Sequence, residues 1–242
     1  MDYDEAIAIA EGVYWVGFYD KVANFHCNPY LIVDGDEAVL IDPGSVPHFP
    51  IVARKVISVV DPKKITNLIV SHQDPDLAGS LPVFEDLINN PALKIVTFER
   101  VSFILAHYGT RSPFYFFEKN NNRLKLMSGR ELIFQPTPYL HTPGAFGTYD
   151  TKSKIFFPGD LFGAFSNEWD LFAKDNYRDQ MSLFHKPYMP SHEILKRVLE
   201  KIEQYDMTMI APQHGSIIKQ ERIKAAIDFL KNLECGDYLK DI

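Results

Sequence analysis

Short apolar runs alternate along the chain with segments in which apolar residues recur at helical spacing. In the first half, this pattern predicts a strand at 11–19 and a hairpin formed by strands 30–33 and 38–41. The turn between them, Asp34-Gly35-Asp36, has residue types that tolerate the positive φ of a tight turn. The same pattern predicts further elements in the order helix 51–60, strand 65–70, helix 81–89, strand 93–96 and helix 99–107.

The second half returns to short strands followed by helices. Its pattern predicts strands 131–135, 146–150 and 154–157, helix 191–204, strand 208–211 and helix 218–233. No linker rich in Pro, Gly or Ser separates the halves, so residues 1–242 are predicted to form a single domain. An α/β sandwich of two sheets flanked by helices fits this order of elements best.

Residues 108–125, between the two halves, show no regular pattern and include four consecutive aromatic residues at 114–117. These aromatic side chains could form an apolar lid or a patch packed on the core, or they could form a docking surface for another subunit or a signalling partner. We favour packing on the core.

The apolar run 65–70 ends in a group of polar side chains. His72, Asp74 and Asp76 follow it at alternate positions, and small residues that can open a helix come next. Negative charge at the mouth of a buried strand is costly unless a cation neutralises it, which favours a metal site. Asp and Pro also form ordinary turns and helix N-caps, so this motif alone leaves both interpretations open.

Three later apolar runs also end in a potential metal ligand close to a glycine. They supply His141, Asp160 and His214. Together with the first motif, these residues make a set of three imidazoles and three carboxylates without sulfur. Such a set suits iron or manganese at least as well as zinc, and affinity rules alone do not exclude zinc. Three carboxylates leave one positive charge of two divalent ions uncompensated, which favours an added anion such as hydroxide or reduced dioxygen.

Composition and charge indicate which kinds of partner and location to expect. The chain has 242 residues, of which 46% are hydrophobic, enough for a large core. Its 25 basic and 32 acidic residues form no basic stripe, so we expect no nucleic-acid partner. No apolar run approaches the ~18 residues of a membrane span, and the first five residues lack the basic start of a signal peptide. We therefore expect a cytoplasmic protein without membrane contact.

The two cysteines, Cys27 and Cys235, lie near opposite ends of the chain and show no regular spacing. We expect both to be free thiols in a reducing compartment, and a thiolate metal site is disfavoured. The histidines that do not follow apolar runs lie in turns or helices, where surface or capping roles are expected. They are His48, His107, His185 and His192.

The order of these loops and their glycines resembles the metallo-β-lactamase superfamily, which implies a four-layer αββα sandwich. The usual hydrolase pattern in its first loop is His-x-His-x-Asp-His, whereas this chain has Asp74 and Leu77 at the second and last histidine positions. A carboxylate at the second position resembles the flavo-diiron branch of that superfamily. The resemblance implies two iron ions bound by the protein. His72, Asp74 and His141 would hold one, Asp76 and His214 would hold the other, and Asp160 would bridge them.

Two further positions gain an interpretation from this resemblance. Leu77 removes one imidazole from the second iron, which predicts a weaker, more exchangeable ion or a substitute ligand from elsewhere. The apolar side chain could also exclude water and protect bound oxygen. His26, in the polar loop 24–29, matches a loop near the diiron pocket, where its Nε2 could hydrogen-bond bound oxygen; a histidine hydrogen-bonded to backbone is the alternative.

Flavo-diiron enzymes carry a flavodoxin-like domain with FMN after the diiron domain, and we expect neither in this chain, which stops at Ile242. A free-standing diiron domain resembles the oxygen-binding diiron proteins, which are oxygen sensors linked to bacterial chemotaxis. The resemblance implies dioxygen bound as a peroxo adduct, a chemoreceptor or other signalling partner, and a homodimer. We favour this sensor over an enzyme. The alternatives are an O2 or NO reductase with a separate electron donor, a dinuclear metal hydrolase, and a degenerate member without metal.

Overall fold

The computed structural model describes residues 1–20, 25–166 and 168–237. Within these ranges the strands form a seven-stranded sheet, a six-stranded sheet and a two-stranded ribbon. The first sheet has the order β1 (Ile7–Ala10), β2 (Val13–Trp15), β5 (Tyr30–Asp34), β6 (Glu37–Ile41), β7 (Ile65–Ile69), β8 (Lys94–Thr97) and β9 (Phe114–Phe116). The second has the order β10 (Arg123–Lys125), β11 (Glu131–Pro136), β12 (Phe146–Asp150), β13 (Ile155–Phe157), β14 (Met209–Ile210) and β15 (Ile218–Lys219). The ribbon pairs β3 (Phe18–Asp20) with β4 (Phe25–Cys27).

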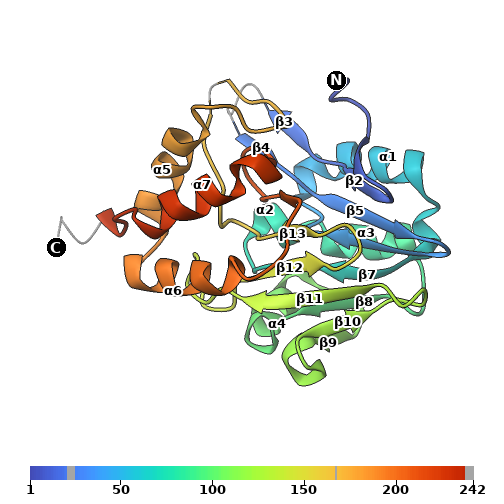
Figure 1. Cartoon of the computed structure of the whole chain (residues 1–242). Coiled ribbons are helices and arrows are strands. Elements are labelled where there is room, and N and C mark those ends of the chain that lie inside the picture. Colours follow the sequence, from blue (N-terminus) through green and yellow to red (C-terminus); the bar gives the residue numbers. More distant parts are fainter. Residues whose placement is uncertain (21–24, 167, 238–242) are drawn as a thin grey trace.

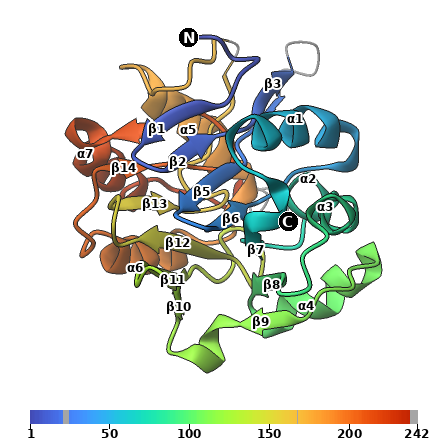
Figure 2. The same cartoon turned by 90° about the vertical axis from the view of Figure 1, so that its right-hand side faces the viewer.

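The helices lie outside the two sheets. The first half contributes α1 (Phe49–Val59), the short α2 (Pro75–Ala78), α3 (Leu81–Ile88) and α4 (Glu99–Leu105), and the second contributes α5 (Tyr177–Tyr188), α6 (His192–Ile202) and α7 (Gln220–Lys231). Single 3-10 turns occupy η1 (Val46–His48), η2 (Pro62–Lys64), η3 (Ala106–Tyr108) and η4 (Phe117–Asn120). Figure 1 shows α1 and α3 on the right and α5 to α7 on the left. Figure 2 shows the strands between α6 and α7 on one side and α1, α3 and α4 on the other.

The side-chain alternation of the strands builds these layers. On β6, Ala38 and Leu40 pack in the apolar cluster beneath the first-half helices, whereas Val39 and Ile41 pack in the cluster between the two sheets. On β13, Phe157 packs between the sheets and Phe156 packs with the second-half helices. A strand whose successive side chains both meet apolar surface must be covered on both faces. The predicted αββα sandwich is therefore confirmed.

The N-terminal strands differ from the prediction. The single strand expected at 11–19 is wrong, because β2 and β3 divide this segment and β1 precedes it. A Cβ atom at Gly17 would lie 2.2 Å from the backbone oxygen of Cys27, so a glycine is required where the chain approaches β4. The expected loop 24–29 contains β4, while residue 24 lies outside the described residues.

The segment 108–125 is also more regular than expected. It contains β9 at the edge of the first sheet and β10 at the edge of the second, joined by η4. Phe117 is fully buried, and its ring centroid lies 4.9 Å from that of Phe134 and 4.5 Å from that of Phe146. Packing on the core is confirmed for Phe117, whereas Phe114 and Phe116 are half-buried on the edge strand.

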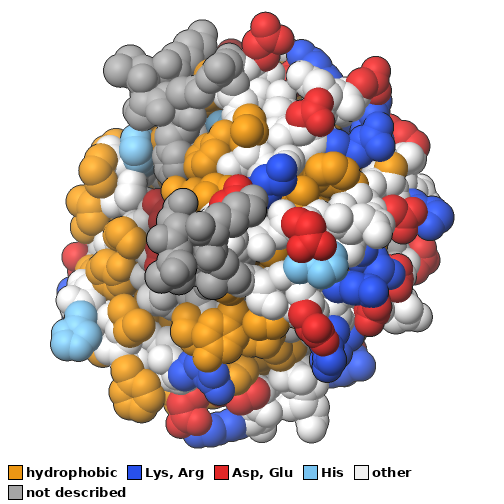
Figure 3. Space-filling view, turned by 90° about the vertical axis from the view of Figure 1, so that its left-hand side faces the viewer, with side chains coloured by type: hydrophobic (Ala, Val, Ile, Leu, Met, Phe, Trp, Pro, Cys, Tyr) orange, Lys and Arg blue, Asp and Glu red, His pale blue; other side chains and the backbone are white. Residues whose placement is uncertain are grey.

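The surface is mixed in character. On the face shown in Figure 3, basic side chains are interspersed with acidic ones, and hydrophobic side chains gather in a separate area. Exposed large apolar residues include Leu183 and Tyr188 on α5. Among the helices of the described ranges, none has both the length and the apolar character needed to cross a membrane.

Candidate metal centre

The first part of the site follows β7. The Asp42 carboxylate, just after β6, accepts hydrogen bonds from the Ser71 backbone N–H at 2.7 Å and the Ser71 hydroxyl at 2.8 Å. These bonds fix the chain direction immediately before His72. Asp74 then lies at the N-terminus of α2, and Asp76 lies in its first turn. The buried strand and the short helix thus hold the three polar side chains of this loop at one end of the first sheet.

The other three predicted ligands come from loops of the second sheet. His141 follows β11, Asp160 follows β13 and His214 follows β14. Backbone hydrogen bonds hold the loops together: Phe146 N–H donates to Ser71 O at 3.1 Å, and Gln213 N–H donates to Gly159 O at 2.8 Å. The four strand-end loops therefore meet at one edge of the sandwich.

Four of the predicted ligands form a first group. His141 Nε2 lies 2.8 Å from Asp160 Oδ2 and 3.4 Å from Asp74 Oδ2. His72 Nε2 lies 3.6 Å from each of the same two oxygen atoms. Donor atoms of His72, His141 and Asp160 all lie within 4.8 Å of one another, which is close enough for one ion to contact them all.

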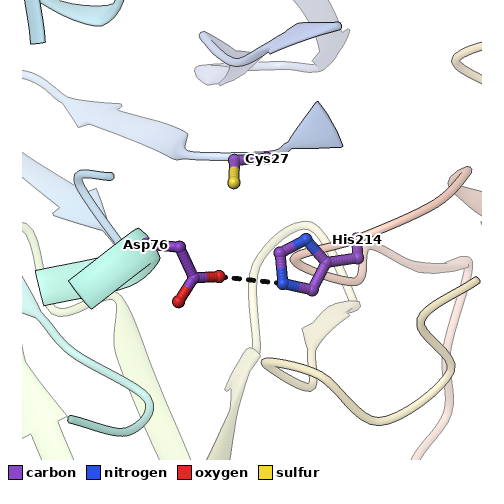
Figure 4. A group of neighbouring side chains, drawn as sticks. All are labelled: Cys27, Asp76 and His214. Atoms are coloured by element: carbon purple, nitrogen blue, oxygen red, sulfur yellow. Dashed lines mark ion pairs between the residues drawn. The ribbon is translucent and has the colours of Figure 1, made fainter. Parts of the chain in front are cut away.

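A second group lies beside the first. His214 Nε2 lies 3.0 Å from Asp76 Oδ2 and 3.5 Å from Asp160 Oδ1. Cys27 joins this group, because its sulfur and donor atoms of Asp76 and His214 lie within 4.8 Å of one another (Figure 4). The position of this cysteine could not be predicted from the sequence, since β4 reaches the site through contacts with β3 and with the distant loop of His214.

Asp160 lies between the two groups. Its Oδ2 faces His72 and His141, and its Oδ1 faces His214. The Asp160 side chain is buried, and Oδ1 has no hydrogen-bond partner among the described residues. A carboxylate whose two oxygens face different groups of donors has the geometry of a bridging ligand.

The carboxylates and imidazoles of the site stabilise each other's charged forms. Burial favours neutral Asp160, but the imidazoles of His72 and His214 hold the pKa of this carboxyl below its ordinary value. Burial also opposes protonation of His72, yet the neighbouring carboxylates of Asp160 and Asp74 raise its pKa to about 9. The pKa of His214 lies well above its ordinary value because Asp160 and Asp76 outweigh its burial. In the metal-free protein, protons on buried imidazoles thus occupy the place that divalent ions would take.

The donors fit a pair of metal ions. His72 Nε2 and Asp160 Oδ1 are buried without a hydrogen-bond partner among the described residues. Buried polar atoms of this kind are rare unless an ion or water satisfies them. The nitrogen and oxygen donors of the six predicted ligands suit iron, with the cysteine as one softer donor beside them.

His26 and Leu77, the two predicted pocket residues, are both buried. Neither ring nitrogen of His26 has a hydrogen-bond partner among the described residues, so the alternative of a backbone-bonded histidine is wrong. The ring packs against Trp169 at 5.3 Å between centroids, and burial, followed by the charge of His214, lowers the pKa of His26 to about 3. Leu77 N–H donates to Asp74 O at 3.1 Å within α2. Contact of either residue with oxygen stays a prediction.

His185 has a role that the sequence analysis missed. It was expected at the surface or at a helix cap, but it is fully buried on α5. Its Nε2 accepts a hydrogen bond from the Phe162 backbone N–H at 3.1 Å, and its Nδ1 lies 2.8 Å from Met181 O. Burial lowers the pKa of His185 to about 4, so the ring is neutral. It therefore fixes the loop that carries Asp160.

Known proteins are similar to this chain to different extents. A nitric oxide reductase of Moorella thermoacetica is 28% identical over 238 residues, which cover 90% of this chain and 58% of that protein. The chain thus spans about half the length of the curated relatives it matches.

Two solved structures match most of the chain. A peroxy diiron species of the chemotaxis sensor ODP is 27% identical, with a TM-score of 0.82 and 98% of both chains covered. The apo state of the chemotaxis sensor ODP from T. denticola is 28% identical, with a TM-score of 0.77, and covers 98% of this chain and 97% of the other. A family model described as "ODP family beta lactamase" matches residues 25–215, and the chain belongs to this family.

Proposed function

We propose that this protein binds dioxygen at a centre of two iron ions and acts as an oxygen sensor in bacterial chemotaxis. The position of Asp160 between the two donor groups carries the proposal, because one carboxylate facing both groups can bridge two ions bound side by side. The likeness to the chemotaxis sensor, which covers nearly all of both chains, supports dioxygen as the ligand.

The geometry suggests how the ions are shared. His72, Asp74 and His141 would hold one ion, and Asp76 and His214 would hold the other, with Asp160 shared between them. Two ferrous ions held there would supply the two electrons needed to bind dioxygen reductively. The burial of His72, Asp160 and His214 keeps bulk water away from these donors.

Signalling needs a partner as well as a ligand. We propose that the chain acts as one domain, as a homodimer, and that a chemoreceptor or another signalling protein reads the state of the site. Exposed apolar side chains such as Leu183 and Tyr188 show that the surface has apolar area beyond the core. Light scattering of the iron-free, ferrous and oxygenated protein measures whether the oligomeric state follows the ligand.

Reduction of NO is the second candidate, since the nitric oxide reductase of Moorella thermoacetica matches 90% of this chain. Catalytic turnover then needs electrons from a donor protein. Mixing the ferrous protein with NO and reduced rubredoxin or a reduced flavoprotein distinguishes the candidates. A reductase consumes many equivalents of NO per chain, whereas a sensor consumes no more than its own irons can reduce.

The first experiment measures metal content and the optical spectrum of protein loaded anaerobically with Fe(II), before and after oxygen is added. The proposal expects about two irons per chain and a visible band that persists under oxygen and disappears when oxygen is removed. Tight zinc without any oxygen response, combined with hydrolysis of ester or phosphoester substrates, would instead support the dinuclear hydrolase.

A further inference from the structure

The two donor groups are unequal if only the six predicted ligands are counted. The first group has His72, His141, Asp74 and the shared Asp160, whereas the second has only Asp76, His214 and the shared Asp160. Leu77, at the position where the superfamily's hydrolases carry a further histidine, offers no donor atom. One more ligand would complete four donors at the second ion.

Cys27 lies where that donor is needed. Its sulfur and one donor atom each of Asp76 and His214 all lie within 4.8 Å of one another. Figure 4 shows the sulfur pointing from β4 toward the space between the Asp76 carboxylate and the His214 ring. The side chain is only 1% exposed, so the thiol faces this group rather than solvent.

We propose that the thiolate of Cys27 binds the second metal ion together with Asp76, His214 and Asp160. This inference rests on the proposed dinuclear centre. When the metal–sulfur bond forms, the thiol proton leaves to solvent and no electron is transferred. The thiolate would be the fourth donor of the second ion.

The backbone holds Cys27 and His214 in one frame. His214 Nδ1 bonds to His26 O at 2.8 Å, which fixes the ring so that Nε2 faces Asp76 and Asp160. Asn28 N–H donates to Gln213 O at 2.8 Å, and the Asn28 amide donates to Pro212 O and Gly215 O, each at 2.9 Å. The residues on both sides of Cys27 are therefore bonded to the loop that carries His214, so the backbone of Cys27 is held beside the site.

Charge and donor type agree with this assignment. Asp160 Oδ1, which lies 3.5 Å from His214 Nε2, lacks a hydrogen-bond partner among the described residues, so the second group has an unsatisfied buried acceptor next to His214. Three carboxylates and one thiolate balance the four positive charges of two divalent ions, which lowers the cost of burying them. A single soft donor also makes the two ions chemically different, with sulfur on one side only.

Zinc-loaded wild-type protein gives a direct test that needs no variant. X-ray absorption at the zinc edge separates sulfur at ~2.3 Å from nitrogen and oxygen at ~2.0–2.2 Å. With two zinc ions per chain, we expect an average of about half a sulfur per zinc. Two bound zinc ions without a sulfur shell would overturn the role of Cys27 and leave the dinuclear centre intact. Failure to bind zinc or iron at all would overturn the centre and this inference together.

Substitutions at the two cysteines then locate the sulfur. Cys27→Ser and Cys27→Ala should lose the sulfur shell, whereas Cys235→Ser, which removes the only other cysteine of the chain, should keep it. We expect the Cys27 variants to bind the second zinc at least ~10-fold more weakly, since even outer partners of metal ligands typically contribute 10–100-fold. Unchanged affinity for both ions, in variants whose circular dichroism matches the wild type, would overturn the proposal.

Discussion

Replacing Asp160 by Asn tests whether one carboxylate joins the two donor groups. Asn keeps the size of the side chain but removes its charge and one of its two acceptor oxygens. Because Oδ2 lies 2.8 Å from His141 and Oδ1 lies 3.5 Å from His214, both ions should lose a ligand. We expect Asp160→Asn to retain less than one metal per chain where the wild type retains two. Asp76→Asn, which touches only the second group, should retain one.

The size of the effect on stability can be worked out for the metal-free protein. Asp160 is the leading cause that raises the pKa of the buried His72 to about 9, against 6.5 for the free side chain. A raised histidine pKa stabilises the folded state fully below pH 6.5, and this stabilisation is lost as the pH rises to about 9. The difference between these pKa values corresponds to about 3 kcal/mol. Asp160→Asn should therefore lower the free energy of unfolding by as much as about 3 kcal/mol at pH 6 and by much less above pH 9.

Urea unfolding of chelator-treated wild type and variant at the two pH values measures this difference. Elemental analysis after dialysis against Fe(II) or Zn(II) measures the metal retained. Two tightly bound metals in Asp160→Asn would refute the bridging geometry. An equal loss of stability at both pH values would refute the electrostatic argument, because it would show that the variant disturbs packing rather than charge.

Three other changes test separate parts of the molecule. Leu77→His should shorten the lifetime of the oxygen-bound form by admitting water and a new donor, which the decay of the visible band measures; Leu77→Met is its control. His185→Phe leaves the buried Phe162 N–H without its acceptor, so we expect ~1–3 kcal/mol lower stability in urea and weaker metal binding; normal metal affinity would refute its positioning of the Asp160 loop. Lys55 is fully buried, and burial lowers its pKa to about 8, so the free energy of unfolding of the wild type should rise between pH 8 and 10.5 as the folded state releases this proton first. Lys55→Met should lack this rise in the same urea titration.

The sequence was sufficient for the parts of the fold that depend on local pattern. The run 65–70 and the polar loop after it correspond to β7 and the loop into α2, because strand and ligands are contiguous in the chain. The hairpin 30–41 corresponds to β5 and β6, because its Gly35 turn at φ +67° is a local requirement. His141, Asp160 and His214 could be singled out because each follows a short apolar run that forms a strand, namely β11, β13 and β14.

Features that depend on distant contacts could not be predicted in this way. Cys27 follows a segment without a clear pattern, and it is brought to Asp76 and His214 by the β3–β4 pairing and by hydrogen bonds of its neighbours to the loop of His214. Helix α5 was also missed, since it is polar overall and contains Pro187 in its last turn. A usable signal was present there, because the buried Tyr177, Met181 and Phe184 recur at helical spacing. His185 shares this buried face, which explains why a histidine expected at the surface lies in the core.

The site draws its donors from both sheets. His72, Asp74 and Asp76 follow a strand of the first sheet, whereas His141, Asp160 and His214 follow strands of the second. Each proposed ion therefore joins the two sheets, and any change in its distances to ligands is shared between them. The cluster of buried residues between the sheets is apolar. Polar links lie at its borders: Asp34 pairs with Arg130 and Lys152, and the ligand loops form a second link at this edge. A ligand that alters the two ions can thus act on the relative position of the sheets, which is what a sensor requires in order to present a changed surface to a partner.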